Sequence, residues 1–119
     1  MLILAKVPPT TYACVVKFNS QCCGVPNSSP ILKYITSYKK KNKIKSITYY
    51  LISPMGREGE YYMAFSLNEL NKTQKDLFTK QIGYTAKSMK DKGSCTTEQQ
   101  MVIDKESLSS QTTITKKTI

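Results

Sequence analysis

Hydrophobic and polar residues follow two different spacings along the chain, and these spacings predict strands and helices in turn. The first segment with a period of two runs from Thr11 to Phe18 and predicts a strand with one buried face. The residues on its buried face are Tyr12, Cys14, Val16 and Phe18. Two later segments, 44–52 and 60–67, are rich in Tyr, Ile, Phe and Leu and flank the turn-forming segment 53–59. They predict two strands joined by a hairpin.

Helical spacing marks two further segments. Ser29 and Pro30 combine a capping hydroxyl with a proline at the first helical position, which predicts that a helix begins there. Its apolar side consists of Ile31, Leu32, Ile35 and Tyr38. A second helix is predicted after Asn71, which resembles a capping pair with Gln74, and Gly83 weakens it in the middle. Its apolar stripe consists of Leu77, Phe78, Ile82, Ala86 and Met89.

The last third of the chain carries a weaker pattern. Met101–Ile103 is a short apolar run, which either forms a fourth strand or does not pair at all. The segment after it consists mainly of Ser, Thr, Gln and Lys, with Leu108 and Ile114 as isolated apolar residues. This composition predicts a disordered polar tail at 105–119 that follows a single domain at 1–104.

The order of these elements is strand, helix, strand, strand and helix, with a further strand if Met101–Ile103 pairs. This order predicts an α+β fold of the ferredoxin-like βαββα(β) type, in which two helices cover one face of an antiparallel sheet. The alternative is a three-stranded α+β domain. In the ferredoxin-like arrangement the hairpin and the connections that follow the first strand and the second helix all lie at one end.

Charge is distributed unevenly along the chain. The first 57 residues contain nine basic side chains and no acidic one, whereas the remainder contains nine lysines and eight acids, so most of the net charge of +10 comes from the first half. Such a surface favours nucleic acid, acidic proteins or anionic lipid headgroups as partners. One part of this charge, Lys39, Lys40, Lys41 and Lys43, follows the first helix, and Arg57 lies in the predicted hairpin turn.

The predicted sheet has a second face that the helices leave open. Strand periodicity places Tyr50 and Tyr62 on that face together with Lys17, and single-stranded nucleic acid stacks on aromatic rings of this kind. The segment 57–65 resembles the RNA-recognition motif only in its loose order of glycine and aromatic residues, because Glu58 and Glu60 replace the alternation of that family's signature. Binding of nucleic acid would therefore be weakly sequence-specific, since lysines outnumber arginine 17 to 1.

The cysteines suggest a disulfide. In the predicted fold Cys95 comes near Cys22 or Cys23, and we expect a bridge from Cys95 to one of this adjacent pair, which cannot easily bridge each other. The position of the pair after the first strand resembles that of cysteines in ferredoxin-like soft-metal carriers, although the two-residue spacer is absent. The chain has no histidine and no Cys-x-x-Cys spacing, so we expect no metal site and no cofactor.

These features together predict a small basic interaction module rather than an enzyme. We expect it to bind another protein, or a second copy of itself, through the open sheet face. Single-stranded nucleic acid is the alternative partner, and thiol or soft-metal binding by the three cysteines is a third reading. The apolar start, residues 1–5, is too short for a signal core or a membrane span. We therefore expect a soluble chain, cytoplasmic or secreted after signal removal, and no small-molecule substrate is inferable.

Overall fold

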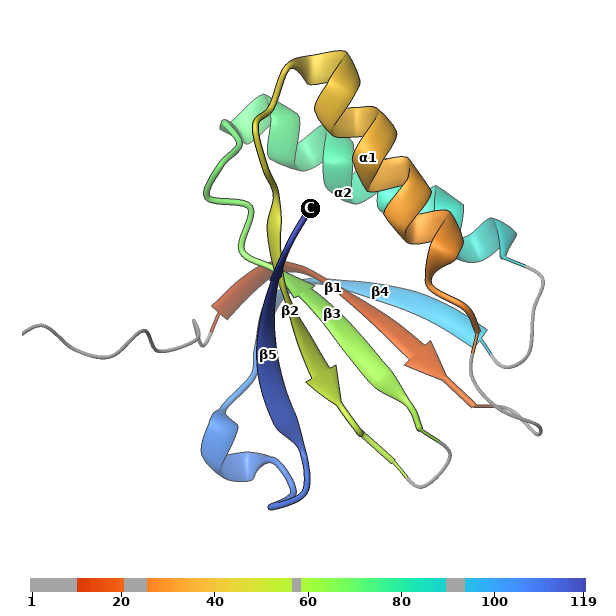
Figure 1. Cartoon of the computed structure of the whole chain (residues 1–119), viewed down its shortest axis with the longest axis vertical. Coiled ribbons are helices and arrows are strands. Elements are labelled where there is room, and N and C mark those ends of the chain that lie inside the picture. Colours follow the sequence, from red (N-terminus) through yellow and green to blue (C-terminus); the bar gives the residue numbers. More distant parts are fainter. Residues whose placement is uncertain (1–10, 21–25, 57–58, 90–93) are drawn as a thin grey trace, which may run out of the picture.

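The computed structural model describes residues 11–20, 26–56, 59–89 and 94–119, and within them the chain forms one sheet and two long helices (Figure 1). The elements in chain order are β1 (Thr11–Asn19), α1 (Ser29–Asn42), β2 (Thr48–Ser53), β3 (Tyr61–Phe65), α2 (Lys72–Ser88), β4 (Ser94–Val102), the short 3-10 helix η1 (Lys105–Ser107) and β5 (Thr113–Thr118). The predicted α+β class is confirmed, because the sheet is antiparallel and both helices lie on the same side of it.

The sheet has five strands in the order β4-β1-β3-β2-β5, and each pair of neighbours is antiparallel. The hairpin of β2 and β3 was predicted and is confirmed. The fourth strand exists, but it begins at Ser94, earlier than the predicted Met101–Ile103. The ferredoxin-like arrangement predicted from the sequence does not include β5, so the observed strand order differs from it.

Both helices begin near the predicted residues, but only α2 has the predicted side-chain cap, because the N-cap of α1 is Ser28 and its side chain makes no capping hydrogen bond. Ser29 and Pro30 open α1, whose first turn contains the proline. The side chain of Asn71 accepts a hydrogen bond from the backbone N–H of Gln74 at 2.8 Å, and the side chain of Gln74 accepts one from the N–H of Asn71 at 3.0 Å. This reciprocal capping box satisfies two N–H groups that the helix cannot pair internally. Neither α1 nor α2 is long and apolar enough to cross a membrane.

The larger hydrophobic cluster lies between the sheet and the helices, and we call it the helix-side cluster. Phe65 of β3, Phe78 of α2 and Tyr38 of α1 meet in it, with ring centroids 5.5 Å apart for the first pair and 5.2 Å apart for Phe78 and Tyr38. Its other buried members are Cys14, Val16, Phe18, Ile31, Ile35, Ile47, Tyr49, Met63, Leu67, Leu70 and Ile82. β2 and β3 contribute Tyr49, Met63 and Phe65 to this cluster, whereas Tyr50 and Tyr62 lie on the other face, as strand periodicity predicted.

A smaller cluster, the second cluster, lies on the opposite face of the sheet. Its buried members are Tyr12, Val15, Ile52, Ala64 and Ile103. Simple alternation along β1 predicts that Tyr12 shares a face with Cys14, and this prediction is wrong. No residue pair joins β1 and β4 at Ala13 and Gln100, where the backbone of Gln100 has a φ of 52°. The interruption coincides with the point at which the alternation of β1 changes face.

Residues 105–119 form ordered structure, which corrects the prediction of a disordered tail. After η1 the chain forms β5, which pairs with β2 over its whole length. The pairing continues at the end of the chain, where Ile119 and Ile47 exchange backbone hydrogen bonds of 2.9 and 3.1 Å. Backbone groups of β2 supply these bonds, so the segment gains order without needing many apolar side chains of its own.

Candidate functional site

The structure brings together three of the predicted binding residues on the face of the sheet that the helices do not cover. Lys17 of β1 lies opposite Tyr62 of β3 in the strand register, and its Nζ is 5.5 Å from the centre of the Tyr62 ring. Tyr50 of β2 packs beside Tyr12 with ring centroids 5.9 Å apart. The two tyrosines are half-buried and contact the second cluster.

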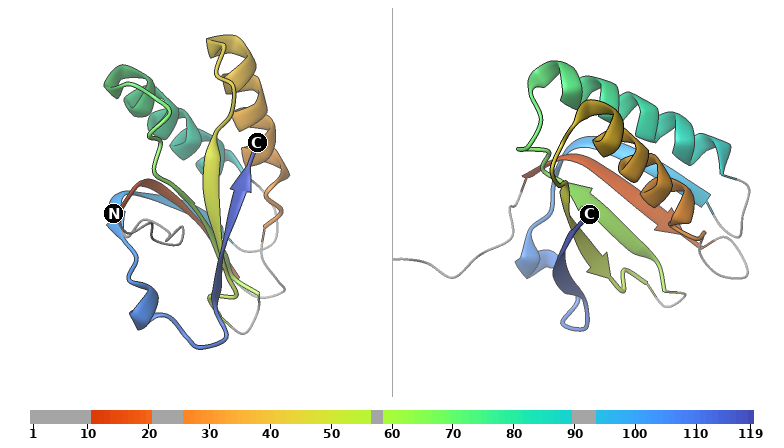
Figure 2. Two further views of the ribbon diagram at one scale, coloured as in Figure 1. Left: turned by 60° about the vertical axis from the view of Figure 1, so that its left-hand side comes forward. Right: turned by 45° about the horizontal axis from the view of Figure 1, so that its top comes forward.

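This face is covered in part and is not open as the sequence predicts. The chain between β4 and β5 crosses from one edge of the sheet to the other on the side away from the helices (Figure 2). Three apolar residues of this segment and of β5, namely Ile103, Leu108 and Ile114, belong to the second cluster or pack against it. A nucleobase would therefore have to displace protein side chains to stack on Tyr50.

Lys17 is also engaged within the protein. Its Nζ donates a hydrogen bond of 2.8 Å to Oε1 of Glu98 on β4 and forms an ion pair with it. The side chain of Lys17 is only 19% exposed. Because its charge is balanced by a neighbouring carboxylate and by the face of the Tyr62 ring, Lys17 is poorly placed to bind a phosphate.

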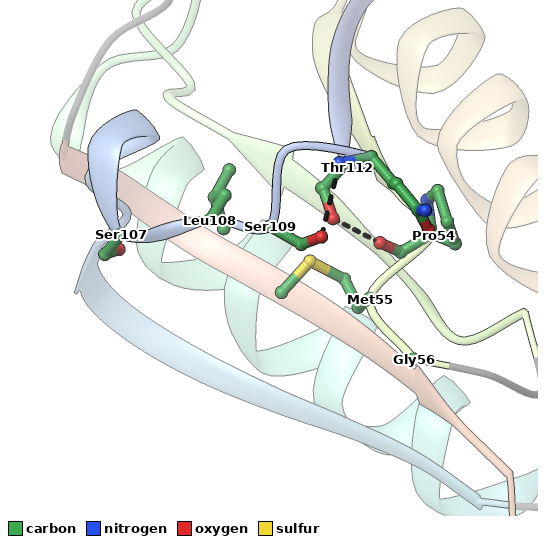
Figure 3. Close-up of a pocket in the computed structure, with 8 residues that line it drawn as sticks. Pro54, Met55, Gly56, Ser107, Leu108, Ser109 and Thr112 are labelled. Carbon is green, nitrogen blue, oxygen red and sulfur yellow. Dashed lines mark hydrogen bonds between the residues drawn. The ribbon is translucent and has the colours of Figure 1, made fainter.

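The segment that crosses the face is held at the hairpin end of β2. The Thr112 hydroxyl donates a hydrogen bond to the carbonyl oxygen of Pro54. Figure 3 shows this contact beside a hollow of about 410 Å³, with the side chains of Met55 and Leu108 at its border. This hydrogen bond helps to hold a polar segment on the sheet, because the Thr112 hydroxyl finds an acceptor in the β2–β3 connection.

The predicted lysines at the end of α1 lie elsewhere, at the end of the helix layer. Lys39, Lys40 and Lys41 belong to the last turn of α1, and Lys43 follows as its C-cap. The Tyr38 hydroxyl donates a hydrogen bond of 3.1 Å to the carbonyl oxygen of Gln74, so the start of α2 lies directly beside them. The sequence therefore located these lysines correctly on α1 but gave no sign of their neighbours on α2.

The predicted disulfide is absent. Cys95 is a free thiol opposite Phe18 in the strand register, and it packs against the helix-side cluster. Burial raises the pKa of Cys95 to about 11, so the thiol is protonated near neutral pH and is a weak nucleophile. Burial likewise raises the pKa of Cys14, a core residue as predicted, to about 12. Cys22, Cys23 and Arg57 lie outside the described residues, so soft-metal binding by the two cysteines and partner binding by Arg57 stay predictions.

The described parts of the chain do not contain a cluster of metal-binding side chains. Within them, no three His, Cys, Asp or Glu side chains come together in a way that could hold a metal ion. The titratable groups with raised pKa values are buried tyrosines and thiols, and burial is the first cause in each case. Tyr12, Cys14 and Cys95 belong to or pack against the two hydrophobic clusters, whereas Tyr34 lines a groove between α1 and α2.

A feature that sequence reasoning missed is the edge strand β4. Among the described residues it pairs with β1 on one side only, since it is the outermost strand of the sheet. Glu98 is its only charged residue, and four further exposed residues are Thr96, Gln99, Gln100 and Val102, the last of them 64% exposed. The sequence does contain a long segment with almost no charge at this position. Its polar residues do not alternate with apolar ones, so periodicity did not predict a strand there.

Comparison with known proteins adds no assignment to these surfaces. No protein-family model matches the chain, and neither a curated protein nor a solved structure matches it.

Proposed function

We propose that the chain is a small basic interaction module without enzymatic activity, and that it binds an extended segment of another protein along the free edge of β4. The scaffold is the ferredoxin-like unit of β1–β4 and the two helices, to which β5 adds a strand at the far edge. Binding by strand addition uses backbone hydrogen bonds for affinity and alternate side chains for selectivity. A sheet edge thus replaces the open sheet face as the binding surface.

The observation that carries this proposal is the chemistry of the edge itself. β4 is nine residues long, and its outer side offers backbone N–H and C=O groups to a further strand. Proteins usually protect such an edge with lysines, prolines or inward charges. The one charge of β4, on Glu98, is already neutralised by Lys17 at 2.8 Å. Apart from the irregular backbone at Gln100, where φ is 52°, β4 therefore carries none of the groups that discourage pairing.

Charge indicates which kind of segment would be bound. A Cβ atom built on Gly83 of α2 would lie 3.6 Å from Oγ1 of Thr97, so this side of α2 faces β4. Lys80 and Lys87 share that helix side because they are three and four residues from Gly83. A strand added to β4 would pass near both lysines. Together with the net charge of +10, this favours an acidic partner segment and disfavours a second copy of the same basic chain.

The test begins with peptides selected against the immobilised protein from a displayed library of random segments. Each selected peptide is synthesised in two forms of equal composition, with N-methyl groups on alternate residues of one edge or of the other. Strand addition predicts that one form loses affinity by about tenfold or more, because several backbone hydrogen bonds are removed, while the other form binds as before. Amide chemical shifts in NMR spectra should change mainly in β4.

Several outcomes would contradict the proposal. Equal affinity of both N-methylated forms would show that binding does not use one row of backbone N–H groups, and shifts centred on β5 or the helices would place the binding site elsewhere. Replacing Asp and Glu of the peptide by Asn and Gln should weaken binding if the partner is acidic. Sedimentation velocity that showed a concentration-dependent dimer with protected β4 amides would replace the foreign partner by a second copy of the chain.

A further inference from the structure

Seven lysines gather where the end of α1 meets the beginning of α2, and we call this surface the lysine pole. Its members are Lys39, Lys40, Lys41, Lys43, Lys45, Lys72 and Lys75. The two helix ends are joined by the hydrogen bond from the Tyr38 hydroxyl to the Gln74 carbonyl oxygen. Figure 1 shows them side by side at the same end of the helix layer. The pole therefore combines a sequence-local run with lysines from a distant helix.

The positive charge of the pole is not balanced by its neighbours. Within the described ranges, no ion pair involves any of its lysines. The nearby acid Glu69 uses Oε2 to accept a hydrogen bond of 2.8 Å from the backbone N–H of Thr48, and Asp76 follows Lys75 on α2. Seven cations against two carboxylates leave an anion-attracting surface. The lysines on α1 are compatible with their helix, because cations stabilise a helix C-terminus.

A groove between the two helices opens at this pole. It encloses about 520 Å³, and its walls include Tyr34 and Tyr38 of α1 together with Leu77 and Gln81 of α2. Lys41 lines it as well, so the groove is continuous with the pole. The side chain of Leu77 is 48% exposed, whereas the sequence placed it in the buried stripe of α2. The groove thus offers an apolar wall, aromatic rings and a side-chain amide next to a row of ammonium groups.

We infer that the lysine pole and this groove bind single-stranded nucleic acid, with phosphates on the lysines and an unstacked base in the groove. Aromatic and apolar walls with adjacent hydrogen-bonding groups accept a base that has left the stack, and lysines accept the backbone. A duplex keeps its bases inside, so it would use the lysines alone. A lysine contacts phosphate as a point charge, without the two-pronged geometry of arginine, so the site reads little sequence.

This inference goes beyond the proposed protein-binding function and uses a different part of the molecule. The lysine pole lies at the end of the helix layer, whereas the β4 edge belongs to the sheet. It also replaces the stacking surface predicted from the sequence, because Tyr50 and Tyr62 pack against the second cluster. Both surfaces can be occupied at once, so an acidic protein segment and a nucleic acid need not compete.

Fluorescence anisotropy with a labelled uridine or thymidine oligonucleotide of about 12 nucleotides tests the inference, with titrations at several salt concentrations. The expected slope of log affinity against log salt is about −0.7 for each phosphate contacted, or about −3 to −5 for most of the pole. A hairpin duplex of equal length should bind more weakly. Flat titrations at low salt, or binding by phosphatidylserine vesicles in the absence of oligonucleotide binding, would overturn the inference.

Matched charge variants separate the pole from the overall charge. Lys40→Gln, Lys41→Gln and Lys72→Gln together remove three exposed charges from the pole, and Lys33→Gln, Lys105→Gln and Lys116→Gln remove three exposed charges from elsewhere. The pole variant should weaken binding by about tenfold or more and reduce the salt slope by about two, since each removed contact lowers it by about 0.7. The control should change binding by less than about twofold. Equal losses would mean that net charge alone attracts the oligonucleotide.

A groove variant tests the second half of the inference. Leu77→Ser removes an exposed apolar side chain from the wall and leaves the net charge unchanged. Loss of the contact between base and wall should reduce affinity several-fold, while the salt slope stays the same because no charge is removed. Unchanged affinity in a folded Leu77→Ser protein would remove the groove from the site.

Discussion

The two faces of the sheet are covered by different kinds of structure, and the face away from the helices is covered only in part. Two regular helices cover one face and interlock with it through Phe65, Phe78 and Tyr38. The other face is covered by η1 and the irregular chain around it, through single residues such as Ile103 and Leu108. The helices are held on their face by regularly spaced apolar side chains. The chain around η1 is held on the other face by the backbone pairing of β5 with β2 and by a few isolated contacts. The faces should therefore respond differently to mutation.

The largest expected difference is in the free energy of unfolding, between a variant of one buried residue in the helix layer and a variant of one in the segment after β4. Phe78→Ala should lower the free energy of unfolding by about 3–5 kcal/mol, because it opens a cavity among closely packed rings. Ile103→Ala should cost about 2 kcal/mol, since the irregular cover can relax around the smaller side chain. Urea denaturation measures both values. Hydrogen exchange should show that Ile103→Ala exposes amides of β5 and leaves the helices protected.

Equal costs for the two variants, or loss of helix protection in Ile103→Ala, would contradict this comparison. Either result would mean that the segment after β4 is as tightly integrated as the helix layer. Both side chains are at least 94% buried in the native protein, with exposures of 0% for Phe78 and 6% for Ile103, so exposure alone would not predict a difference.

A smaller contrast comes from two tyrosine hydroxyls. The hydroxyl of Tyr38, on the helix side, donates to the Gln74 carbonyl oxygen, so Tyr38→Phe should lower stability by about 1 kcal/mol. The hydroxyl of Tyr12, in the second cluster, is buried and has no hydrogen-bond partner among the described residues. Tyr12→Phe should therefore raise stability by about 1 kcal/mol, because it removes an unsatisfied polar group. Thermal unfolding of both variants checks the signs, and a loss for Tyr12→Phe would contradict the expectation.

The smallest effect measures how closely the helix layer approaches the sheet. Gly83→Ala should raise stability by about 0.5–1 kcal/mol, because alanine favours the helix and the new Cβ meets Thr97 at an ordinary contact distance of 3.6 Å. Gly59→Ala is the matched control in the hairpin, where a φ of +85° makes the same change unfavourable. If Gly83→Ala destabilises the protein, α2 lies closer to β4 than this spacing indicates.

Elements with local chemical signals were predictable from the sequence. Pro30 marks the first turn of α1, and the capping box of Asn71 and Gln74 marks the start of α2. Each signal lies within a few neighbouring residues, so no tertiary information is needed to find it. The alternation in β2 and β3 likewise separated Tyr49 and Met63 from the opposite face. In each case the physical cause of the structure acts over a short stretch of chain.

Elements that depend on distant backbone groups were not predictable. β5 contains little apolar surface, and its order comes from pairing with β2. The two strands lie about 60 residues apart in the sequence, since Ile114 pairs with Ile52. The polar beginning of β4 is a strand for the same reason, because β1 supplies its partners. Isolated apolar residues such as Leu108 indicate burial only once the surface that they cover is known.

The candidate surfaces show the same division. The lysines at the end of α1 were visible as a run, but Lys72 and Lys75 join them only through the packing of α1 against α2. Lys17 was predicted as a free cation on an exposed face. Its carboxylate partner, Glu98, lies 81 residues further along the chain, and only the strand order brings the two together.

The edge strand β4, whose one charged residue is paired with Lys17, also bears on how the protein behaves in concentrated solution. Two copies that meet edge to edge could extend their sheets across the contact, and the net charge of +10 is what keeps them apart. Added salt shortens the range of that repulsion to about 10 Å at 0.1 M. Solubility should therefore fall as ionic strength rises, because repulsion between the net charges, rather than the side chains of β4, limits association of the edges.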